Sequence, residues 1–312
     1  MSEEKTIFLT SGASDVGVAT IKKLVNAGYK TYGVVYNRDE AEIIRAVNGI
    51  PVFSLPNHAG ELRAMIAMSK AKVVVHLAPL AANHPPFSPP SYTPDQITQE
   101  TVALLEAAKA ADVNFFIHGS YTLLYGHTNG ETVDESSPLT KASDPLVAAG
   151  ILAEKAVIKS ELPYCILRTG YIYSPNSEAI HKLDRALKSS SAVFTSEGYA
   201  GWVYADDVAN AVLKAIEKQP EGEIFNIVDD TPATTAEFVQ YLCEAQGIEP
   251  PGAVSSILKM FSRNPNPTLL GFSAKPSNNK AKAYLEWSPR FKDYRQGIDD
   301  LLLEWRAQIN VN

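Results

Sequence analysis

The sequence has few of the features that mark secreted, membrane or metal-binding proteins. It holds only two cysteines, Cys165 and Cys243, in 312 residues, which supports neither a disulfide framework nor a zinc site. Its apolar runs are shorter than the roughly 20 residues that cross a bilayer. The acidic start, M-S-E-E-K, does not resemble a signal or transit peptide. We therefore expect a cytoplasmic protein with no metal site and no membrane partner.

Clusters of positive charge are also lacking. The chain has 28 Lys and Arg residues against 35 Asp and Glu residues, a net charge of −7, and its basic residues are scattered. Without a basic patch, neither nucleic acid nor an anionic membrane is an expected partner. The expected partner is a small-molecule substrate, and the length allows one large domain or two unequal ones.

What the sequence does contain is a regular alternation of short apolar runs and amphipathic segments. Helix-length segments separate most of the apolar runs, and such an order predicts a parallel sheet covered on both faces. The fold class is therefore α/β, a Rossmann-type doubly wound parallel sheet with a smaller C-terminal substrate lobe. The apolar runs of strand length are 6–10, 31–36, 50–55, 72–78, 114–119, 163–168 and 223–228.

Two segments interrupt this alternation and suggest how the chain is divided. A Pro-rich stretch follows the fourth predicted strand, and the region after about residue 229 is mostly helical in pattern. We expect a dinucleotide-binding domain made of residues 1–170 and 200–230. The substrate-binding lobe should comprise residues 171–199 and 231–312. Ligands of such sheets lie beyond the carboxyl ends of the strands, so the loops there should form one cleft.

Several segments share the sequence pattern of one family. They are I-H-G-S-Y-T-L-L-Y-G (117–126), V-D-E-S-S-P (133–138), L-A-E-K (152–155), L-P-Y-C-I-L-R-T-G-Y-I-Y-S-P (162–175) and W-V-Y-A-D-D-V-A-N-A (202–211). In this order and spacing they resemble the extended short-chain dehydrogenase/reductase family of NAD-dependent epimerase/dehydratase-like proteins. The resemblance implies a nicotinamide cofactor and a small substrate with a carbonyl or hydroxyl group, such as a sugar nucleotide, with an apolar substrate as the alternative. It also allows a homodimer through helices 95–111 and 145–160.

The turn after the first strand departs from the family pattern T-G-x-x-G-x-x-G. From Thr10 to Gly17 it reads T-S-G-A-S-D-V-G, so serine replaces two glycines, and an alignment on Gly12 leaves the turn one residue short. Free N–H groups at the helix start favour a phosphate there. The carboxylate of Asp15 opposes a phosphate, unless it only caps the helix. The predicted cofactor contacts in this turn are Gly12, Ser14, Asp15 and Val16.

The segment after the second strand bears on the choice of cofactor. Val35 stands where NAD-preferring relatives have an Asp for the ribose, and Asn37 and Arg38 follow it. A guanidinium at that place fits a 2′-phosphate, which favours NADP over NAD. The alternative is an exposed Arg at a helix start. Further cofactor contacts are expected from Leu77, Ala78 and Thr169.

The helix that should supply the catalytic pair of the family lacks it. When the alignment is counted back from Ala153, the Tyr and Lys positions of the Tyr-x-x-x-Lys motif are Leu146 and Gly150. None of the 14 tyrosines has a Lys four residues later. In the family this Lys lowers the pKa of the Tyr, which exchanges a proton with the substrate. The chain is therefore an atypical member by resemblance, and Tyr121 with Ser120 is the predicted replacement. The alternative for Tyr121 is an aromatic packing role.

Substrate contacts are expected on both sides of the cleft. The candidates are Pro79 and His84 after the fourth strand, Tyr171 after the sixth, and Arg185 on a basic helix face that also carries His181, Lys182 and Lys188. A solvated face is the alternative for that helix. Arg168 should form a structural ion pair, and His76 and His118 should be interior side chains with hydrogen-bond partners.

Three functional hypotheses remain open at this point. The first is an NAD(P)-dependent oxidoreductase or isomerase with a non-standard proton donor. The second is a catalytically inactive relative that binds a nucleotide or metabolite as a sensor or regulatory module. The third is non-redox chemistry in the same cleft.

Overall fold

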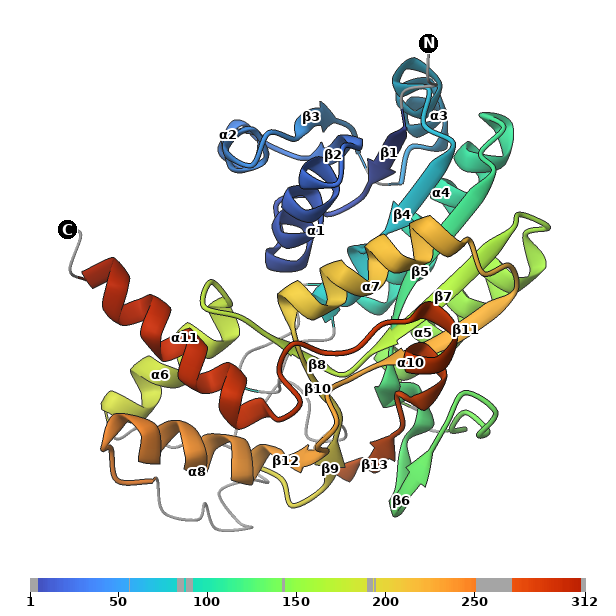
Figure 1. Ribbon diagram of the computed structural model, residues 1–312. Helices are drawn as coiled ribbons and strands as arrows, with labels where there is room; N and C mark the ends of the chain where they lie inside the picture. The colour runs from blue at the N-terminus through green and yellow to red at the C-terminus, as the bar shows by residue number, and fades with distance from the viewer. Residues whose placement is uncertain are drawn as a thin grey trace.

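A parallel sheet of seven strands forms the centre of the chain in the computed structural model (Figure 1). The structure describes residues 5–55, 57–82, 87, 92–141, 144–189, 193, 195–250 and 271–309. The strand order is β11-β7-β5-β4-β1-β2-β3, and every neighbouring pair is parallel. This confirms the predicted fold class. The strands are β1 (Thr6–Leu9), β2 (Lys30–Val35), β3 (Ile50–Phe53), β4 (Val73–His76), β5 (Phe115–Tyr121), β7 (Tyr164–Thr169) and β11 (Glu223–Ile227).

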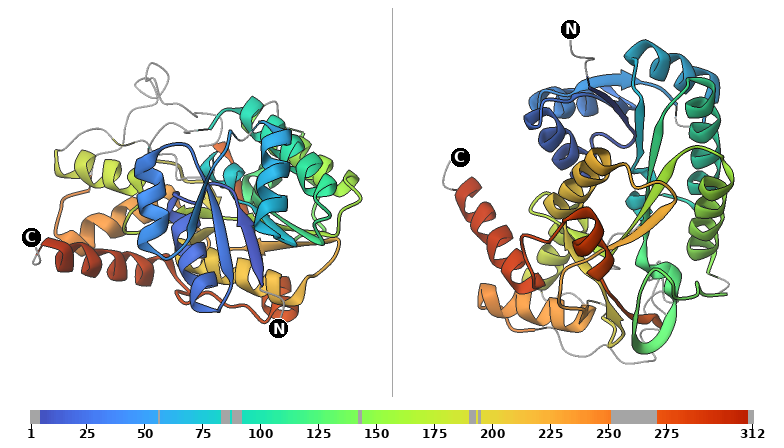
Figure 2. Two further views of the ribbon diagram at one scale, coloured as in Figure 1. Left: turned by 90° about the horizontal axis from the view of Figure 1, so that it is seen from above. Right: turned by 45° about the vertical axis from the view of Figure 1, so that its right-hand side comes forward.

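Helices cover both faces of this sheet, as Figure 2 shows. The apolar residues of each strand alternate between two buried clusters, one on each face, which is why the strands read as continuous apolar runs. One cluster includes α1 (Asp15–Asn26), α2 (Arg38–Ala46) and α7 (Ala205–Lys218). The other includes α3 (Ala59–Ser69), α4 (Pro94–Ala110) and α5 (Pro145–Lys159).

Local signals in the sequence set the starts of the two longest of these helices. Thr93 and Gln96 form a reciprocal capping box at the start of α4. Asp144 caps α5, because its Oδ1 accepts from the N–H groups of Leu146 at 3.0 Å and Val147 at 3.2 Å. Proline at the first position of α5 gives up no hydrogen bond there.

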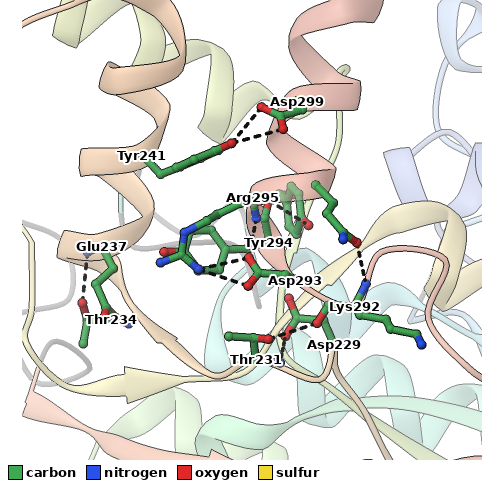
Figure 3. Close-up of polar contacts among 12 residues, drawn as sticks. Asp229, Thr231, Thr234, Glu237, Tyr241, Lys292, Asp293, Tyr294, Arg295 and Asp299 are labelled. Carbon is green, nitrogen blue, oxygen red and sulfur yellow. Dashed lines mark hydrogen bonds and ion pairs between the residues drawn. The ribbon is translucent and has the colours of Figure 1, made fainter.

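The smaller lobe is built from short strand pairs and helices around an aromatic core. Trp202 stacks on Phe238 with ring centroids 4.0 Å apart, and Tyr173 and Tyr294 pack beside them. Figure 3 shows how α8 and α11 are joined, with the Tyr241 hydroxyl bound to the carboxylate of Asp299. The elements are β8 (Tyr171–Tyr173), α6 (Glu178–Lys188), β9 (Tyr199–Ala200), β10 (Trp202–Tyr204), β12 (Ala233–Thr234), α8 (Thr235–Gln246) and α11 (Tyr294–Ile309).

Three further elements connect the lobe with the sheet. The strand β6 (His127–Val133) pairs with β13 (Ser273–Pro276), and α10 (Asn279–Leu285) follows. Ala281, Leu285 and Trp287 are buried in the same apolar cluster as α1 and α7. This part of the C-terminal region therefore packs on the large domain, inside the range that we expected for the lobe. Within the described residues, no helix is long and apolar enough to span a membrane.

Candidate functional site

Two serines build the turn between β1 and α1, where the family has glycines. Ser11 has a φ of +53°, a left-handed conformation that glycine adopts more readily. The Ser11 carbonyl accepts from both the Oγ (2.7 Å) and the N–H (3.1 Å) of Ser14. Ser14 in turn caps α1, since its Oγ accepts from the Gly17 N–H at 3.1 Å. The turn therefore keeps a tight geometry with different residues.

Glycine remains where this turn is most crowded. A Cβ on Gly17 would lie 2.1 Å from the Ser11 carbonyl oxygen, and a Cβ on Gly12 would lie 2.6 Å from Cδ1 of Ile44. The first-turn N–H groups of Asp15 and Val16 have no partner inside the helix, and they lie at its positive end. The start of α1 thus has the backbone groups that bind an anion.

The Asp15 side chain contacts the opposite side of the cleft instead of capping its own helix. Its Oδ2 accepts from the Oγ of Ser174, which follows β8, at 2.9 Å. Burial raises the pKa of the Asp15 carboxyl, while the Ser174 hydrogen bond and His181 act to lower it. The capping role considered for Asp15 is wrong, because Ser14 caps α1.

At the carboxyl end of β2, the carboxylate of Glu40 accepts hydrogen bonds from two neighbouring residues. Its Oε2 accepts from the Tyr36 N–H at 2.8 Å, and its Oε1 accepts from Nδ2 of Asn37 at 2.8 Å. Asn37 also caps α2 through Oδ1, so both polar atoms of its side chain are engaged. Arg38 is exposed and makes no ion pair with any residue that the structure describes.

The hydroxyl group of Thr10 contacts three successive residues at the end of β4. Oγ1 of Thr10 accepts from the N–H groups of Leu77 (3.0 Å) and Ala78 (3.2 Å) and lies 2.9 Å from Nδ1 of His76. The other ring nitrogen of His76 lies 3.0 Å from Oγ1 of Thr101, so the expected satisfied histidine is confirmed. Leu77, Ala78 and Pro79 are buried at the start of η1 (Ala78–Ala82). His84 lies outside the described residues.

His118 lacks the hydrogen-bond partners that we expected for both interior histidines. It is fully buried, and neither ring nitrogen has a hydrogen-bond partner in the part of the chain that the structure describes. Burial lowers the pKa of His118 to about 4, so the ring is neutral near pH 7. The prediction of a hydrogen-bonded His118 is therefore wrong.

Tyr121 fills the space that the missing lysine would need. Its hydroxyl donates to the Leu146 carbonyl at 2.8 Å, and none of its side chain is exposed. A Cβ on Gly150 would lie 2.5 Å from the Tyr121 Oη and 2.7 Å from Cζ. The buried ring thus explains why α5 has a glycine in its interior. Burial and the nearby Glu154 and Asp144 raise the pKa of Tyr121, and the geometry agrees with the packing role considered as its alternative.

Ser120 belongs to a buried polar network below this helix. Its Oγ donates to Oε1 of Glu154 at 2.6 Å. Glu154 also accepts two hydrogen bonds from Arg168, at 2.9 and 2.7 Å, which confirms the predicted structural pairing of that arginine. Arg168 donates further to Tyr125, whose hydroxyl donates to Asn226. Ser120 is only 1% exposed, and its hydroxyl is engaged in this network. The hydroxyl of Thr169, another buried residue, donates to the Ser120 carbonyl.

Hydroxyl groups line a narrow cavity between η2 (Thr122–Tyr125) and the lobe. Its wall includes Tyr171, Thr122, Ser196 and Thr235, and the role of Tyr171 as a substrate contact stays a prediction. The hydroxyls of Thr122 and Tyr171 make no hydrogen bond to any residue within the described ranges. Apolar walls come from Leu123, Phe272, Ala274 and Pro276. Ser196 and Thr235 were not among the residues expected from the sequence, because no local motif marks them.

The basic face of α6 is largely paired. Lys182 lies 2.7 Å from Glu178, and Lys188 lies 2.7 Å from Asp184. His181 stacks on Trp305 of α11 at 4.8 Å. Arg185 is exposed, with no ion pair to the described residues. Among those residues, no group of three or more His, Cys, Asp or Glu side chains could hold a metal ion.

Comparison with known proteins identifies the family. The sequence model of the NAD dependent epimerase/dehydratase family matches residues 7–228, and the chain belongs to this family. The 4-hydroxy-2-methyl-3-oxo-4-farnesyl-3,4-dihydroquinoline-1-oxide ketoreductase of Stigmatella aurantiaca is 25% identical over 252 residues, which cover 78% of this chain and 73% of the relative. The dTDP-D-glucose 4,6-dehydratase of Mus musculus is 26% identical over 247 residues, 72% of this chain and 68% of the relative.

Solved structures share the fold. The dTDP-glucose 4,6-dehydratase of Bacillus anthracis, in complex with NAD, superposes with a TM-score of 0.78 at 19% identity and covers 97% of each chain. The UDP-glucose 4-epimerase of Thermotoga maritima, with UDP-glucose, has a TM-score of 0.75 at 22% identity over 97% of this chain and 99% of that one. These likenesses extend over both the sheet and the lobe.

Proposed function

We propose that this chain binds a nicotinamide dinucleotide and a small molecule without using the proton relay typical of its family, as a sensor or regulatory binding protein. The observation that carries the proposal is the packing of Tyr121 against Gly150. The buried phenol hydroxyl donates to a carbonyl of α5, and no ammonium group stands at residue 150 to lower its pKa. The inner face of helix α5 therefore packs against Tyr121, at the place where the family pattern has the Tyr and Lys that exchange the proton.

The residues of the α1 turn fit a dinucleotide. The unpaired N–H groups of Asp15 and Val16 suit a pyrophosphate, and Gly17 keeps the backbone close to the turn. The Asp15 carboxylate is held by Ser174, so its hydrogen bond is directed toward the lobe. Several solved structures that share this fold are complexes with NAD, which supports the same class of ligand for this chain.

When bound, a nicotinamide cofactor supplies a hydride donor or acceptor. The chain's own residues bind and orient it: the α1 turn at the pyrophosphate, and Leu77 and Ala78 as a buried wall after β4. Arg185, exposed on α6, is our proposed contact for an anionic part of the small molecule.

A second candidate function is a carbonyl reductase or isomerase with a different proton donor. The free hydroxyls of Thr122 and Tyr171 in the hydroxyl-lined cavity favour it, and one relative is named a ketoreductase. In that case Tyr171 would deliver the proton to the substrate oxygen.

Titration of the purified chain with NADH, followed by a survey of carbonyl substrates at fixed NADH, separates these functions. The first proposal predicts a rise in melting temperature with NADH and no NADH oxidation. Oxidation that Tyr171→Phe abolishes and Tyr121→Phe leaves intact would establish the second. If NADH does not change the melting temperature, both are wrong.

A further inference from the structure

We propose that the hydrogen bond between Asp15 and Ser174 is an autoinhibitory latch, which joins the two sides of the ligand-free cleft and which a dinucleotide must break to bind. The inference rests on the proposed dinucleotide binding and adds a form of regulation to the same site. The carboxylate of Asp15 then opposes the cofactor, whereas its N–H group remains a predicted contact.

The latch connects the large domain with the smaller lobe. Asp15 is the first residue of α1, and Ser174 directly follows β8. Oδ2 of Asp15 accepts from the Oγ of Ser174 at 2.9 Å, and Ser174 is only 5% exposed. A hydrogen bond to an ionised carboxylate is roughly twice as strong as one between neutral groups. The contact is therefore strong enough to hold the two sides together.

The latched carboxylate lies at the end of α1 that the ligand needs. The N–H groups proposed to hold the pyrophosphate belong to Asp15 itself and to Val16. A pyrophosphate diester carries two negative charges, which repel a carboxylate fixed beside them. Burial already raises the pKa of the Asp15 carboxyl, so this place disfavours the charged form even before a phosphate arrives. Released from Ser174, the side chain can turn into water, where the repulsion is weaker.

The segment that carries Ser174 is tied to α6 and α11, which lie side by side in Figure 1. The carbonyl of Pro175 accepts from Nε1 of Trp305 on α11 at 2.7 Å. The ring of Trp305 also stacks on His181 of α6, with centroids 4.8 Å apart. A displacement of Ser174 therefore reaches the C-terminal helix, which gives a sensor a change that a partner could detect.

An ordinary structural contact predicts the opposite effect on the ligand. If the hydrogen bond only shaped the cleft, its removal would leave dinucleotide affinity unchanged or lower it. A latch costs binding energy, so its removal should raise the affinity. The sign of the change decides between the two roles.

The first test is calorimetric titration with NADH of the unmodified chain and of two variants. Ser174→Ala should bind about fivefold more tightly, the value of one hydrogen bond that no longer has to break. Asp15→Ala should bind at least about tenfold more tightly, because it loses the negative charge as well. Asp206→Ala is the matched control and should not change the affinity, since Asp206 is an exposed acidic residue in the first turn of α7, on the same face of the sheet.

The second test uses the unmodified chain and does not depend on how well the variants fold. Trp202 and Trp287 are 0% and 1% exposed, whereas Trp305 is half-buried beside the latch segment. Addition of NAD should change the tryptophan emission, and Trp305→Phe should lose most of that change.

The outcomes separate this inference from the proposed function. Unchanged or weaker NADH binding by a folded Ser174→Ala or Asp15→Ala protein overturns the latch. So does a tryptophan emission that stays constant while NAD binds. If neither the unmodified chain nor any variant binds NADH, the proposed function itself fails.

Discussion

The turn at the start of α1 and the inner face of α5 both depart from the family motif, with opposite results. In the turn, Ser11 and Ser14 rebuild the bend that glycines would form, and Ser14 caps the Gly17 N–H while the N–H groups of Asp15 and Val16 have no partner inside the helix. On α5, Tyr121 fills the space over Gly150 and hydrogen-bonds to the helix. A motif can therefore disappear from the sequence while its tight backbone geometry survives, as in the turn, or while its place is closed by packing, as on α5.

The largest expected effect concerns the inner face of α5. Glu154→Ala leaves Arg168 buried without its partner, which should lower the free energy of unfolding by roughly 3 to 5 kcal/mol. Urea denaturation measures this loss. Glu161→Ala, which breaks an exposed pair with Lys109, is the control and should leave the free energy of unfolding almost unchanged. A loss of NADH affinity in a still folded Glu154→Ala protein would contradict a purely structural role for this face.

The next effect tests the turn. Gly17→Ala places a Cβ against the Ser11 carbonyl oxygen, and because this neighbour is backbone, we expect roughly 3 kcal/mol of destabilisation. The distorted turn should also bind NADH at least about tenfold more weakly in calorimetry at a temperature where the variant is folded. Unchanged affinity would show that the α1 turn does not hold the dinucleotide.

The contact between Tyr121 and Gly150 predicts that the effect of Gly150→Ala on the free energy of unfolding changes sign when Tyr121 is replaced by serine. Gly150→Ala should destabilise the chain by about 2 kcal/mol because of the clash with the phenol. In a Tyr121→Ser background the same change should stabilise it by about 1 kcal/mol, the helix propensity of alanine over glycine.

A control for that cycle lies elsewhere in the fold. Gly60 in α3 has open space where its Cβ would be, so Gly60→Ala should be neutral or slightly stabilising in both backgrounds. Additive effects of Tyr121→Ser and Gly150→Ala in urea denaturation would argue against the packing explanation for Gly150.

The smallest expected effect returns to the turn. Ser11→Gly removes a non-glycine residue from the left-handed region and should stabilise the chain by about 0.5 to 1 kcal/mol. NADH affinity should stay the same, since the Ser11 carbonyl remains in place to hold Ser14. A lower melting temperature of this variant would mean that the Ser11 side chain has a role beyond the turn geometry.

Local patterns were enough to predict the fold, because the burial of strands and the capping of helices are encoded within short stretches. The seven strands of the parallel sheet were accessible in this way, and the family resemblance added the structural pairing of Arg168. The contacts that decide the site are long-range. Asp15 meets Ser174 across 159 residues, and only the packing of β5 on α5 shows that Gly150 accommodates a phenol ring.

The most direct test of the account compares NADH binding by the unmodified chain and by Tyr121→Phe in isothermal titration calorimetry. This variant loses only the hydrogen bond to Leu146, worth about 1 kcal/mol of stability. The account predicts that both proteins bind NADH with dissociation constants that agree within about twofold. Failure of the unmodified chain to bind NADH would contradict it.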